Sequence, residues 1–403
     1  MQLTIEEQSI IEGKKGVALQ KAMEILVALG NIYNADRLIP VHSVQVAGVS
    51  YKNLGDAGLE FLREWAKEGA KIHENVNTNL NPAGMDLEQW EKLGFSESFA
   101  TKQNEVIQCF QGLGISPICS CTPYLLGNVP RLGEHIAWSE SSAVSYANSV
   151  LGARTNREGG PSALATAILG KTPCYGLHLT ENRKANFLID VQCELKNEAD
   201  YGALGYIVGK KISSGIPYFR GIYDPLNEYL KSLGAAMAAT GAVALYHIEN
   251  VTPEALQTNM LAESYETIVI SSLQEGYEAM NTSVNDIDLV SLGCPHASYA
   301  EIRKIAEYLD GKKIKSALWI TTSQPMYYYA KRDGALQIIE KAGGKIVCDT
   351  CMIVAPISEL GIQSLMTNSA KAAFYAPNHC HVAVRYGNLK DCIDVAVRGK
   401  VNM

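Results

Sequence analysis

The fold is decided by residues 287–309, IDLVSLGCPHASYAEIRKIAEYL. Residues 287–292 are mostly apolar and predict a short buried strand. Ser298 and Glu301 form the S-x-x-E pattern of a helix-capping box, and apolar side chains then recur at helical spacing up to Leu309. The segment therefore predicts a strand, a loop that contains Cys294, and a helix.

The same alternation continues toward the C-terminus. Residues 317–321 predict a second strand, a helix follows and ends at Gly343-Gly344, and residues 345–348 predict a third strand. Strands that alternate with helices pair in parallel as βαβ units. We therefore expect a doubly wound α/β domain over residues 276–403.

Earlier parts of the chain carry weaker signals of the same kind. We predict an α/β domain over 1–134 and a mixed α/β middle domain over 135–275, with approximate boundaries. The predicted strands outside the last domain share short apolar stretches and lie at residues 38–46, 115–119, 187–191, 205–208 and 242–246. Residues 75–84 are polar and rich in Asn, and they predict a loop.

Composition narrows the class of protein. The chain has 403 residues, 47% hydrophobic and 19% charged, with a net charge of -7. An acidic chain without Lys/Arg clusters is a poor candidate for binding nucleic acid or an anionic membrane. The N-terminal residues are acidic where a signal peptide is basic, and no apolar run approaches the ~20 residues that span a bilayer. We expect a cytoplasmic protein, in which ten cysteines are unlikely to form disulfides.

Three cysteines follow three predicted strands. Cys121 lies after the strand at 115–119, Cys294 after 287–292, and Cys351 after 345–348. Ligands of parallel α/β sheets bind beyond the carboxyl ends of the strands. A cysteine that only fills the core has no reason to prefer such loops. Cys121, Cys294 and Cys351 are therefore the candidate metal ligands.

Three thiolates leave one coordination position open. A structural zinc or a fully ligated iron–sulfur cluster takes four protein ligands, whereas an open iron can act as a Lewis acid on a substrate hydroxyl. This favours an iron–sulfur dehydratase. The rival is zinc held by the three cysteines and His296. Cys119 and Cys348 still belong to predicted strands and are left out of the ligand set, although spacing alone does not settle this choice.

Several other motifs have an ordinary structural explanation beside a functional one. The backbone of Gly48-Val49-Ser50 can bind an anion or form a tight turn. Asn81-Pro82 lies in a substrate loop or an ordinary turn. Ser369 and Lys371 suit a phosphate or carboxylate, but a lone lysine is usually a surface residue. The polar cluster from Arg154 to Glu158 either lines a cleft or ends a helix.

Taken together, these motifs resemble the aconitase X family across nearly the whole chain. The resemblance rests on Gly48-Val49-Ser50-Tyr51, Asn81-Pro82-Ala83-Gly84-Met85-Asp86, Cys121-Thr122-Pro123-Tyr124, residues 152–159, Gly293-Cys294-Pro295-His296 and Asp349-Thr350-Cys351. It implies an aconitase-like, multi-domain α/β architecture with parallel βαβ units around a central cleft. It implies an iron–sulfur cluster on Cys121, Cys294 and Cys351. Three cysteines are compatible with [4Fe-4S], with [3Fe-4S] after oxidative loss of the open iron, or with a two-iron cluster, and the sequence does not distinguish them. The resemblance also implies substrate contacts from Gly48, Val49, Ser50, Asn81, Pro82, Ser369 and Lys371.

The length resembles that of the large subunit of the archaeal form of this family. That form dehydrates (R)-5-phosphomevalonate to trans-anhydromevalonate 5-phosphate in a modified mevalonate pathway for isoprenoids. A small subunit supplies its catalytic serine, so the resemblance implies a heteromer and no general base on this chain. Two alternatives stay open: dehydration of cis-3-hydroxy-L-proline by the same chemistry, and a zinc-bearing binding protein without catalysis.

Overall fold

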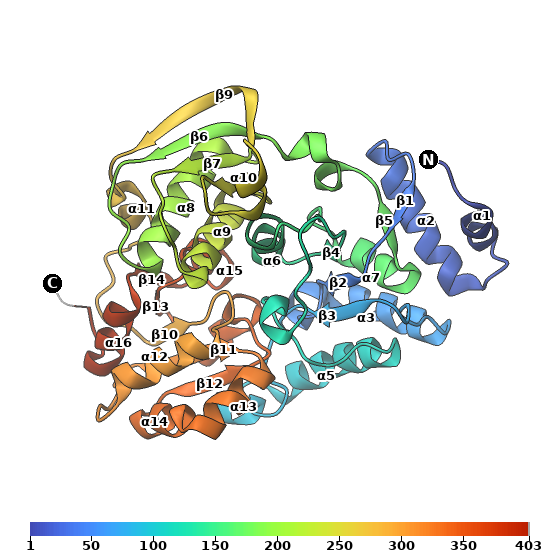
Figure 1. Ribbon diagram of the computed structural model, residues 1–403. Coiled ribbons are helices and arrows are strands. Elements are labelled where there is room, and N and C mark those ends of the chain that lie inside the picture. Colours follow the sequence, from blue (N-terminus) through green and yellow to red (C-terminus); the bar gives the residue numbers. More distant parts are fainter. Residues whose placement is uncertain (402–403) are drawn as a thin grey trace.

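The last third of the chain forms a five-stranded parallel sheet with strand order β12-β11-β10-β13-β14. The computed structural model describes residues 1–401, and Figure 1 shows this sheet and its helices in orange and red. The predicted strands at 287–292, 317–321 and 345–348 are confirmed. The strands are β10 (Leu289–Leu292), β11 (Ala317–Thr322), β12 (Lys345–Cys348), β13 (Ser364–Thr367) and β14 (Ala383–Tyr386).

Helices pack on this sheet through the apolar stripes that the sequence predicts. The capping box of Ser298 and Glu301 is present at the start of α12 (Tyr299–Leu309), whose buried face includes Ile302 and Ile305. All four residues of β10 are buried, as expected for the central strand of a covered parallel sheet. The other helices of this part are α13 (Gln324–Asp333), α14 (Ala335–Ala342), α15 (Ala370–His379) and α16 (Leu389–Arg398).

The N-terminal part contains a three-stranded parallel sheet with strand order β3-β2-β4. Its strands are β2 (Ser43–Val46), β3 (Asn77–Leu80) and β4 (Ala137–Trp138), and β1 (Leu38–Pro40) pairs separately with β5 (Lys171–Pro173). The helices are α1 (Ile5–Ile11), α2 (Val17–Ile32), α3 (Tyr51–Lys67), α4 (Trp90–Leu93), α5 (Glu97–Gly112), α6 (Ser141–Tyr146) and α7 (Gly160–Leu169). A π-helical turn at Ala147–Leu151 extends α6.

Three predictions for this part are wrong in detail. The strand predicted over 38–46 is divided into β1 and β2. The predicted loop at 75–84 contains β3, where alternate residues are buried although the segment is polar. Residues 115–119 form no strand and make only one isolated bridge, between Leu80 and Cys119. Pro117 has no backbone N–H for a ladder, which explains the missing strand.

The middle part has a parallel sheet with strand order β8-β7-β6-β9. In Figure 1 its long strand β9 runs along the outer edge, and α8 and α9 lie on one face. The strands are β6 (Ala185–Val191), β7 (Pro217–Arg220), β8 (His247–Ile248) and β9 (Leu261–Ile270). The helices are α8 (Glu198–Ile212), α9 (Asn227–Gly241), α10 (Pro253–Gln257) and α11 (Gln274–Ala279).

The strand predicted at 187–191 is confirmed as β6, but the two other predictions in this part are wrong. Residues 205–208 belong to α8, and residues 242–246 pair with no strand. A Cβ added at Gly205 would lie 2.5 Å from the carbonyl oxygen of Leu233. That glycine therefore permits close packing of α8 on α9 and does not mark a strand. The division of the chain at residues 134 and 275 stays a prediction.

The length and composition of the helices show whether any of them could cross a membrane. Among residues 1–401, none combines the length and the apolar character that a bilayer crossing requires.

Candidate active site

A cavity of about 350 Å³ lies where strand ends from the first and the last sheets meet. The loops after β2, β3 and β4, with the loop that the parallel Leu80–Cys119 bridge holds beside β3, form one side, called the first rim: residues 47–50, 81–84, 119–122 and 139–142. The loops after β10, β12 and β13 form the other side, called the second rim: residues 293–297, 349–354 and 368–371. Both rims consist of the carboxyl ends of parallel strands, where such sheets bind their ligands.

The two rims are joined directly by backbone hydrogen bonds. The Ala83 N–H donates to the Asp349 carbonyl oxygen at 2.9 Å, and the Cys351 N–H donates to the Ala83 carbonyl oxygen at 3.2 Å. The Ser50 hydroxyl also donates to the Val354 carbonyl oxygen at 2.8 Å. These bonds fix the distance between the loops that line the cavity.

The three candidate cysteines line this one cavity. Cys121, Cys294 and Cys351 are all free thiols on its wall, although they lie far apart in the sequence. Cys119 and Cys348 are buried and are not among the residues that line this cavity. Among residues 1–401, no three His, Cys, Asp or Glu side chains are grouped closely enough to be ligands of a single ion.

Burial sets the protonation state of these thiols. It raises the pKa of Cys121 well above its ordinary value, and it raises the pKa of Cys351, which Cys294 also raises, to about 12. Burial likewise raises the pKa of Cys294, although the Lys371 ammonium acts in the opposite direction. Thiols of this kind stay protonated until a cation takes the place of the proton. The donor set therefore suits a soft, thiophilic metal group.

Hydrogen-bond donors already point at two of the sulfurs. The His296 backbone N–H donates to Cys121 Sγ at 3.1 Å, and the Ser369 side chain bonds to the Cys294 thiol. Donors around sulfur are one way in which proteins tune iron–sulfur centres. Two loops of the second rim, those of His296 and Ser369, thus stabilise thiolate charge.

His296 is not free to bind zinc. Its Nε2 lies 2.8 Å from the Thr350 carbonyl oxygen and its Nδ1 lies 3.1 Å from the Ser120 hydroxyl, so both ring nitrogens are engaged. Since a carbonyl can only accept, Nε2 carries the proton. Burial lowers the pKa of His296 to about 4, which keeps the ring neutral. The side chain therefore ties the loop of Cys121 to that of Cys351.

A buried ion pair crosses the cavity from rim to rim. Lys371 on the second rim contacts Glu140 on the first, and only 12% and 14% of these side chains are exposed. Asn81 Nδ2 donates to the other Glu140 oxygen at 2.9 Å. Burial opposes ionisation of Glu140, but Lys371 outweighs it and holds the pKa at about 2. Burial opposes and Glu140 favours the charged form of Lys371, whose pKa is raised.

Arg157 and two unpaired polar atoms complete the wall. Arg157 lines the cavity, and within residues 1–401 its guanidinium makes no ion pair. Since Lys371 and Glu140 neutralise each other, Arg157 supplies the excess positive charge. Asn81 Oδ1 and the Ser139 hydroxyl are buried without a hydrogen-bond partner among residues 1–401. Buried polar atoms are normally paired, so these two mark a place for a polar ligand.

The sequence-predicted substrate residues fall into two groups. Gly48, Val49, Ser50, Asn81, Pro82 and Lys371 all line the cavity. Ser369 lies behind Cys294 instead, where it lines an adjoining cavity of about 20 Å³ and its hydroxyl accepts the Ala372 N–H at the start of α15. Within the polar cluster, Arg157 reaches the cavity, whereas Arg154 donates to the His178 carbonyl oxygen at 2.9 Å.

Sequence reasoning missed Glu140. It follows a strand of only two residues, β4, and it directly precedes α6, so the segment resembles an ordinary helix start. The usable signal was the abrupt change from the apolar residues 136–138 to four polar residues at 139–142. The same rule of strand ends that selected the cysteines would have found it.

Comparison with known families covers the chain in three pieces. Models of the aconitase X first, second and third domains match residues 1–181, 185–278 and 287–398.

Individual relatives extend over the same length. The phosphomevalonate dehydratase large subunit of Methanocaldococcus jannaschii is 52% identical over 402 residues, covering 98% of this chain and 99% of the relative. The crystal structure of Thermococcus kodakaraensis aconitase X, described as a holo-form, superimposes with a TM-score of 0.92 at 50% identity, over 98% of this chain and 100% of that one. The cis-3-hydroxy-L-proline dehydratase of Pseudomonas aeruginosa is 33% identical over 98% of this chain and 70% of its own length.

Proposed function

We propose that this chain is the large subunit of a phosphomevalonate dehydratase. The premise is that the chain belongs to the aconitase X family. The reaction would convert (R)-5-phosphomevalonate to trans-anhydromevalonate 5-phosphate. The observation that carries the proposal is the cavity that brings three free thiols, a Lys–Glu pair and an unpaired arginine together. The substrate follows from the identity of 52% to a phosphomevalonate enzyme against 33% to a hydroxyproline enzyme.

Cys121, Cys294 and Cys351 would hold an iron–sulfur cluster, which we propose to be [4Fe-4S]. When bound through three cysteines, such a cluster keeps one iron open, and that iron acts as a Lewis acid on a departing hydroxyl. The fit rests on the donor set: three free thiols on the wall of one cavity, two of them with a hydrogen bond to sulfur. Because each thiolate of a cluster binds a different iron, the ligands need not be grouped around one point.

The chain's own charged residues would bind the two ends of a doubly anionic substrate. Arg157 is unpaired and presents a planar donor fork that matches a phosphate. The loop at Gly48-Val49-Ser50 precedes α3 and adds backbone N–H groups near the positive end of that helix. Lys371 stays protonated, and Glu140 and Asn81 hold its ammonium in place for the carboxylate end. Since Glu140 is ionised, it is no proton donor at neutral pH.

Proton removal would come from another chain. Two candidate bases in the cavity are engaged, Glu140 by Lys371 and His296 by Ser120 and Thr350. His379 also lines the cavity, but it is an exposed residue at the end of α15. The relative from Methanocaldococcus jannaschii is named as a large subunit, which implies a small one beside it. We therefore propose a heteromer in which a small subunit closes the cavity, excludes water and supplies a serine as the base.

The test is anaerobic purification of the chain with the small subunit, followed by turnover of two substrates. We expect dehydration of (R)-5-phosphomevalonate and at most trace activity on cis-3-hydroxy-L-proline. The reverse preference would replace the substrate assignment but keep the dehydratase. Activity on neither substrate, with the cluster fully present, contradicts the proposed function.

Arg157 provides a second arm of this test. Arg157→Lys keeps the charge but loses the planar fork, and Arg157→Gln removes both. Because a hydrogen bond to a charged group is worth ~1.5–3 kcal/mol, we expect KM for phosphomevalonate to rise roughly tenfold or more in Arg157→Gln, and less in Arg157→Lys. Equal KM values in wild type and both variants would show that phosphate is bound elsewhere.

A further inference from the structure

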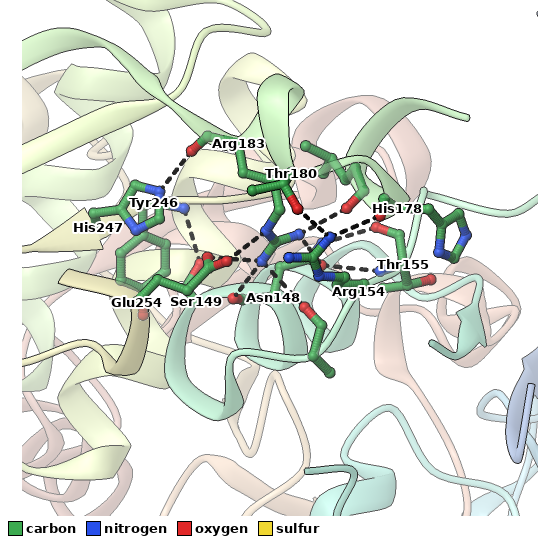
Figure 2. Close-up of polar contacts among 12 residues, drawn as sticks. Asn148, Ser149, Arg154, Thr155, His178, Thr180, Arg183, Tyr246, His247 and Glu254 are labelled. Carbon is green, nitrogen blue, oxygen red and sulfur yellow. Dashed lines mark hydrogen bonds and ion pairs between the residues drawn. The ribbon is translucent and has the colours of Figure 1, made fainter. Parts of the chain in front are cut away.

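Arg183 is a fully buried charged side chain that lies between the first part of the chain, residues 1–181, and the second part, residues 185–278. None of it is exposed, and it follows residue 181, where the match to the first domain ends. Its guanidinium pairs with both carboxylate oxygens of Glu254, Nε with Oε1 at 2.8 Å and Nη2 with Oε2 at 2.9 Å (Figure 2). Glu254 lies on α10 of the second part. The side chain of Arg183 thus binds α10 of the second part.

The Arg183 guanidinium also donates hydrogen bonds to three residues of the first part. Nη1 donates to Asn148 Oδ1 at 3.2 Å and to the Leu177 carbonyl oxygen at 2.9 Å. Nη2 donates to the carbonyl oxygens of Asn148 at 3.2 Å and Ala153 at 3.1 Å. Asn148 lies within the π-helical turn Ala147–Leu151, and Ala153 lies two residues beyond it. Such turns are rare and are frequently found at functional sites.

The Asn148 side chain also forms two hydrogen bonds with the backbone of Thr155. Its Oδ1 also accepts the Thr155 N–H at 3.0 Å, and its Nδ2 donates to the Thr155 carbonyl oxygen at 2.9 Å. The same Nδ2 donates to the Ala244 carbonyl oxygen of the second part at 2.9 Å. Figure 2 shows Asn148 and Thr155 beside the guanidinium of Arg183. Asn148 is therefore bound to both parts of the chain.

Thr155 then holds two segments of the cavity wall. Its hydroxyl accepts the Trp138 N–H at 3.1 Å and donates to the Asn156 carbonyl oxygen at 2.7 Å. Glu140 is two residues beyond Trp138, and Arg157 is two residues beyond Thr155. Both Glu140 and Arg157 line the cavity. The path from Arg183 to these residues consists of buried hydrogen bonds throughout.

We propose that Arg183 is a positioning residue for substrate binding, acting through Asn148 and Thr155 on Glu140 and Arg157. It couples the placement of α10 to the shape of the cavity, so that residues 185–278, none of which lines the cavity, still influence the site. The assignment rests on the proposed function, because Glu140 and Arg157 are substrate contacts only there. A buried ion pair is weak evidence for stability as such, and a role in fixing one conformation explains its retention.

The test compares three variants of the complete heteromer. Thr155→Val keeps every contact of Arg183 but removes the hydroxyl that reaches Trp138, and Arg183→Lys keeps the charge opposite Glu254 but loses the fork. Arg220→Lys is the matched control, since its ion pair with Glu249 is half exposed on the same domain. We expect KM for phosphomevalonate to rise roughly tenfold in the first two, in keeping with the loss of a buried hydrogen bond, with kcat within about twofold. The control should match wild type.

The outcomes separate positioning from a purely structural role. A lowered melting temperature with wild-type KM in both Arg183→Lys and Thr155→Val overturns the proposal. If Arg183→Lys fails to fold, Thr155→Val alone decides. If wild type turns over no phosphomevalonate, the proposed function fails, and the rate at which iodoacetamide alkylates Cys294 in cluster-free protein takes the place of KM. A rate changed several-fold in Thr155→Val but unchanged in Arg220→Lys supports positioning, and equal rates contradict it.

Discussion

The two rims of the cavity are held in different ways, although both consist of the carboxyl ends of parallel strands. The second rim is held by its own sheet: the Ala297 N–H donates to the Thr321 carbonyl oxygen at 3.0 Å and the Asp349 N–H to that of Thr322 at 2.7 Å. The hydroxyls of Thr321 and Thr322, at the end of β11, donate to the carbonyl oxygens of Gly293 and Ala297 at 2.6 and 2.7 Å. The first rim depends on buried side-chain amides. Gln103 Oε1 accepts the N–H groups of Tyr51 and Gly84, both at 3.0 Å.

Another glutamine completes the first rim. Gln45 Nε2 donates to the Ser120 carbonyl oxygen at 2.9 Å, and Gln45 Oε1 accepts the Glu140 N–H at 3.3 Å. The contrast follows from sheet size, since the first rim belongs to a sheet of three strands, one of them the two-residue β4, and the second to a sheet of five. Loops that emerge from a full sheet are held by the sheet, whereas loops from a fragmentary one need dedicated side chains. Substitutions should therefore act differently on the two rims.

The largest effect is expected where both rims supply one metal group. Replacing Cys294 by Ser, or Cys121 by Ser on the opposite side, should abolish turnover and iron retention, because three thiolates are the minimum for the proposed cluster. The measurements are iron content and visible absorbance after anaerobic purification. Cys119→Ser is the matched control: it lies two residues from Cys121, its thiol donates to the Pro117 carbonyl oxygen at 3.3 Å, and a hydroxyl can do the same. If Cys119→Ser lost its iron while Cys121→Ser kept it, Cys119 and not Cys121 would be the ligand.

The next effect concerns the ion pair that joins the rims. Glu140→Gln or Lys371→Met leaves one buried charge without its partner, which costs about 3–5 kcal/mol, whereas the double variant should recover most of that loss. The free energy of unfolding in urea provides the measurement. Additive losses in the double variant would mean that the pair does not couple the rims.

The pair also has a pH signature. The pKa of Glu140 is held at about 2, below the ordinary 4.5, so its stabilising contribution is complete above pH 4.5 and is lost as the pH falls toward 2. Glu140→Gln should be less sensitive to acid over this range, relative to its own stability at neutral pH. An identical pH profile of unfolding in wild type and variant contradicts the assignment.

A pair of glycines compares the rigidity of the rims. Both have positive φ, 87° at Gly293 and 83° at Gly48. A Cβ at Gly293 would lie 2.1 Å from the Thr321 carbonyl oxygen, but at Gly48 the nearest atom is a Leu54 methyl at 3.6 Å. Gly48→Ala should therefore cost only the backbone penalty of about 1–2 kcal/mol. Gly293→Ala should cost more and also displace Cys294, with loss of iron. Equal melting temperatures would show that the second rim is not the stiffer one.

The smallest effect is expected from an amide of the first rim. Gln103→Leu removes the acceptor of two N–H groups and costs about 1–3 kcal/mol for the unpaired groups left behind. Because the loops at Gly48 and Gly84 lose their anchor, KM should rise while iron content stays at the wild-type level. Thermal unfolding and substrate titration measure the two consequences. A loss of iron as large as in Cys294→Ser would mean that the rims are not independent.

The same contrast explains what the sequence could reveal. Cys294, Cys351 and Lys371 follow full-length strands of a regular βαβ sheet, whose apolar runs and caps are local signals. Cys121 was selected from a strand that does not exist, and its position depends on the Leu80–Cys119 bridge and on His296 from far along the chain. Glu140 escaped notice because a two-residue strand leaves no periodic pattern. Its low pKa depends on Lys371, 231 residues away, which no local pattern encodes.

The most direct test of the central claim is the iron and acid-labile sulfide content of the anaerobically purified chain, compared with Cys121→Ser and Cys351→Ser. If one cysteine of the first rim and two of the second share a cluster, wild type should carry roughly three to four irons and four sulfides per chain. Either variant, although its lost thiol lies on a different rim, should lose most of both. Zinc without sulfide in wild type, or undiminished iron and sulfide in either variant, would contradict the account.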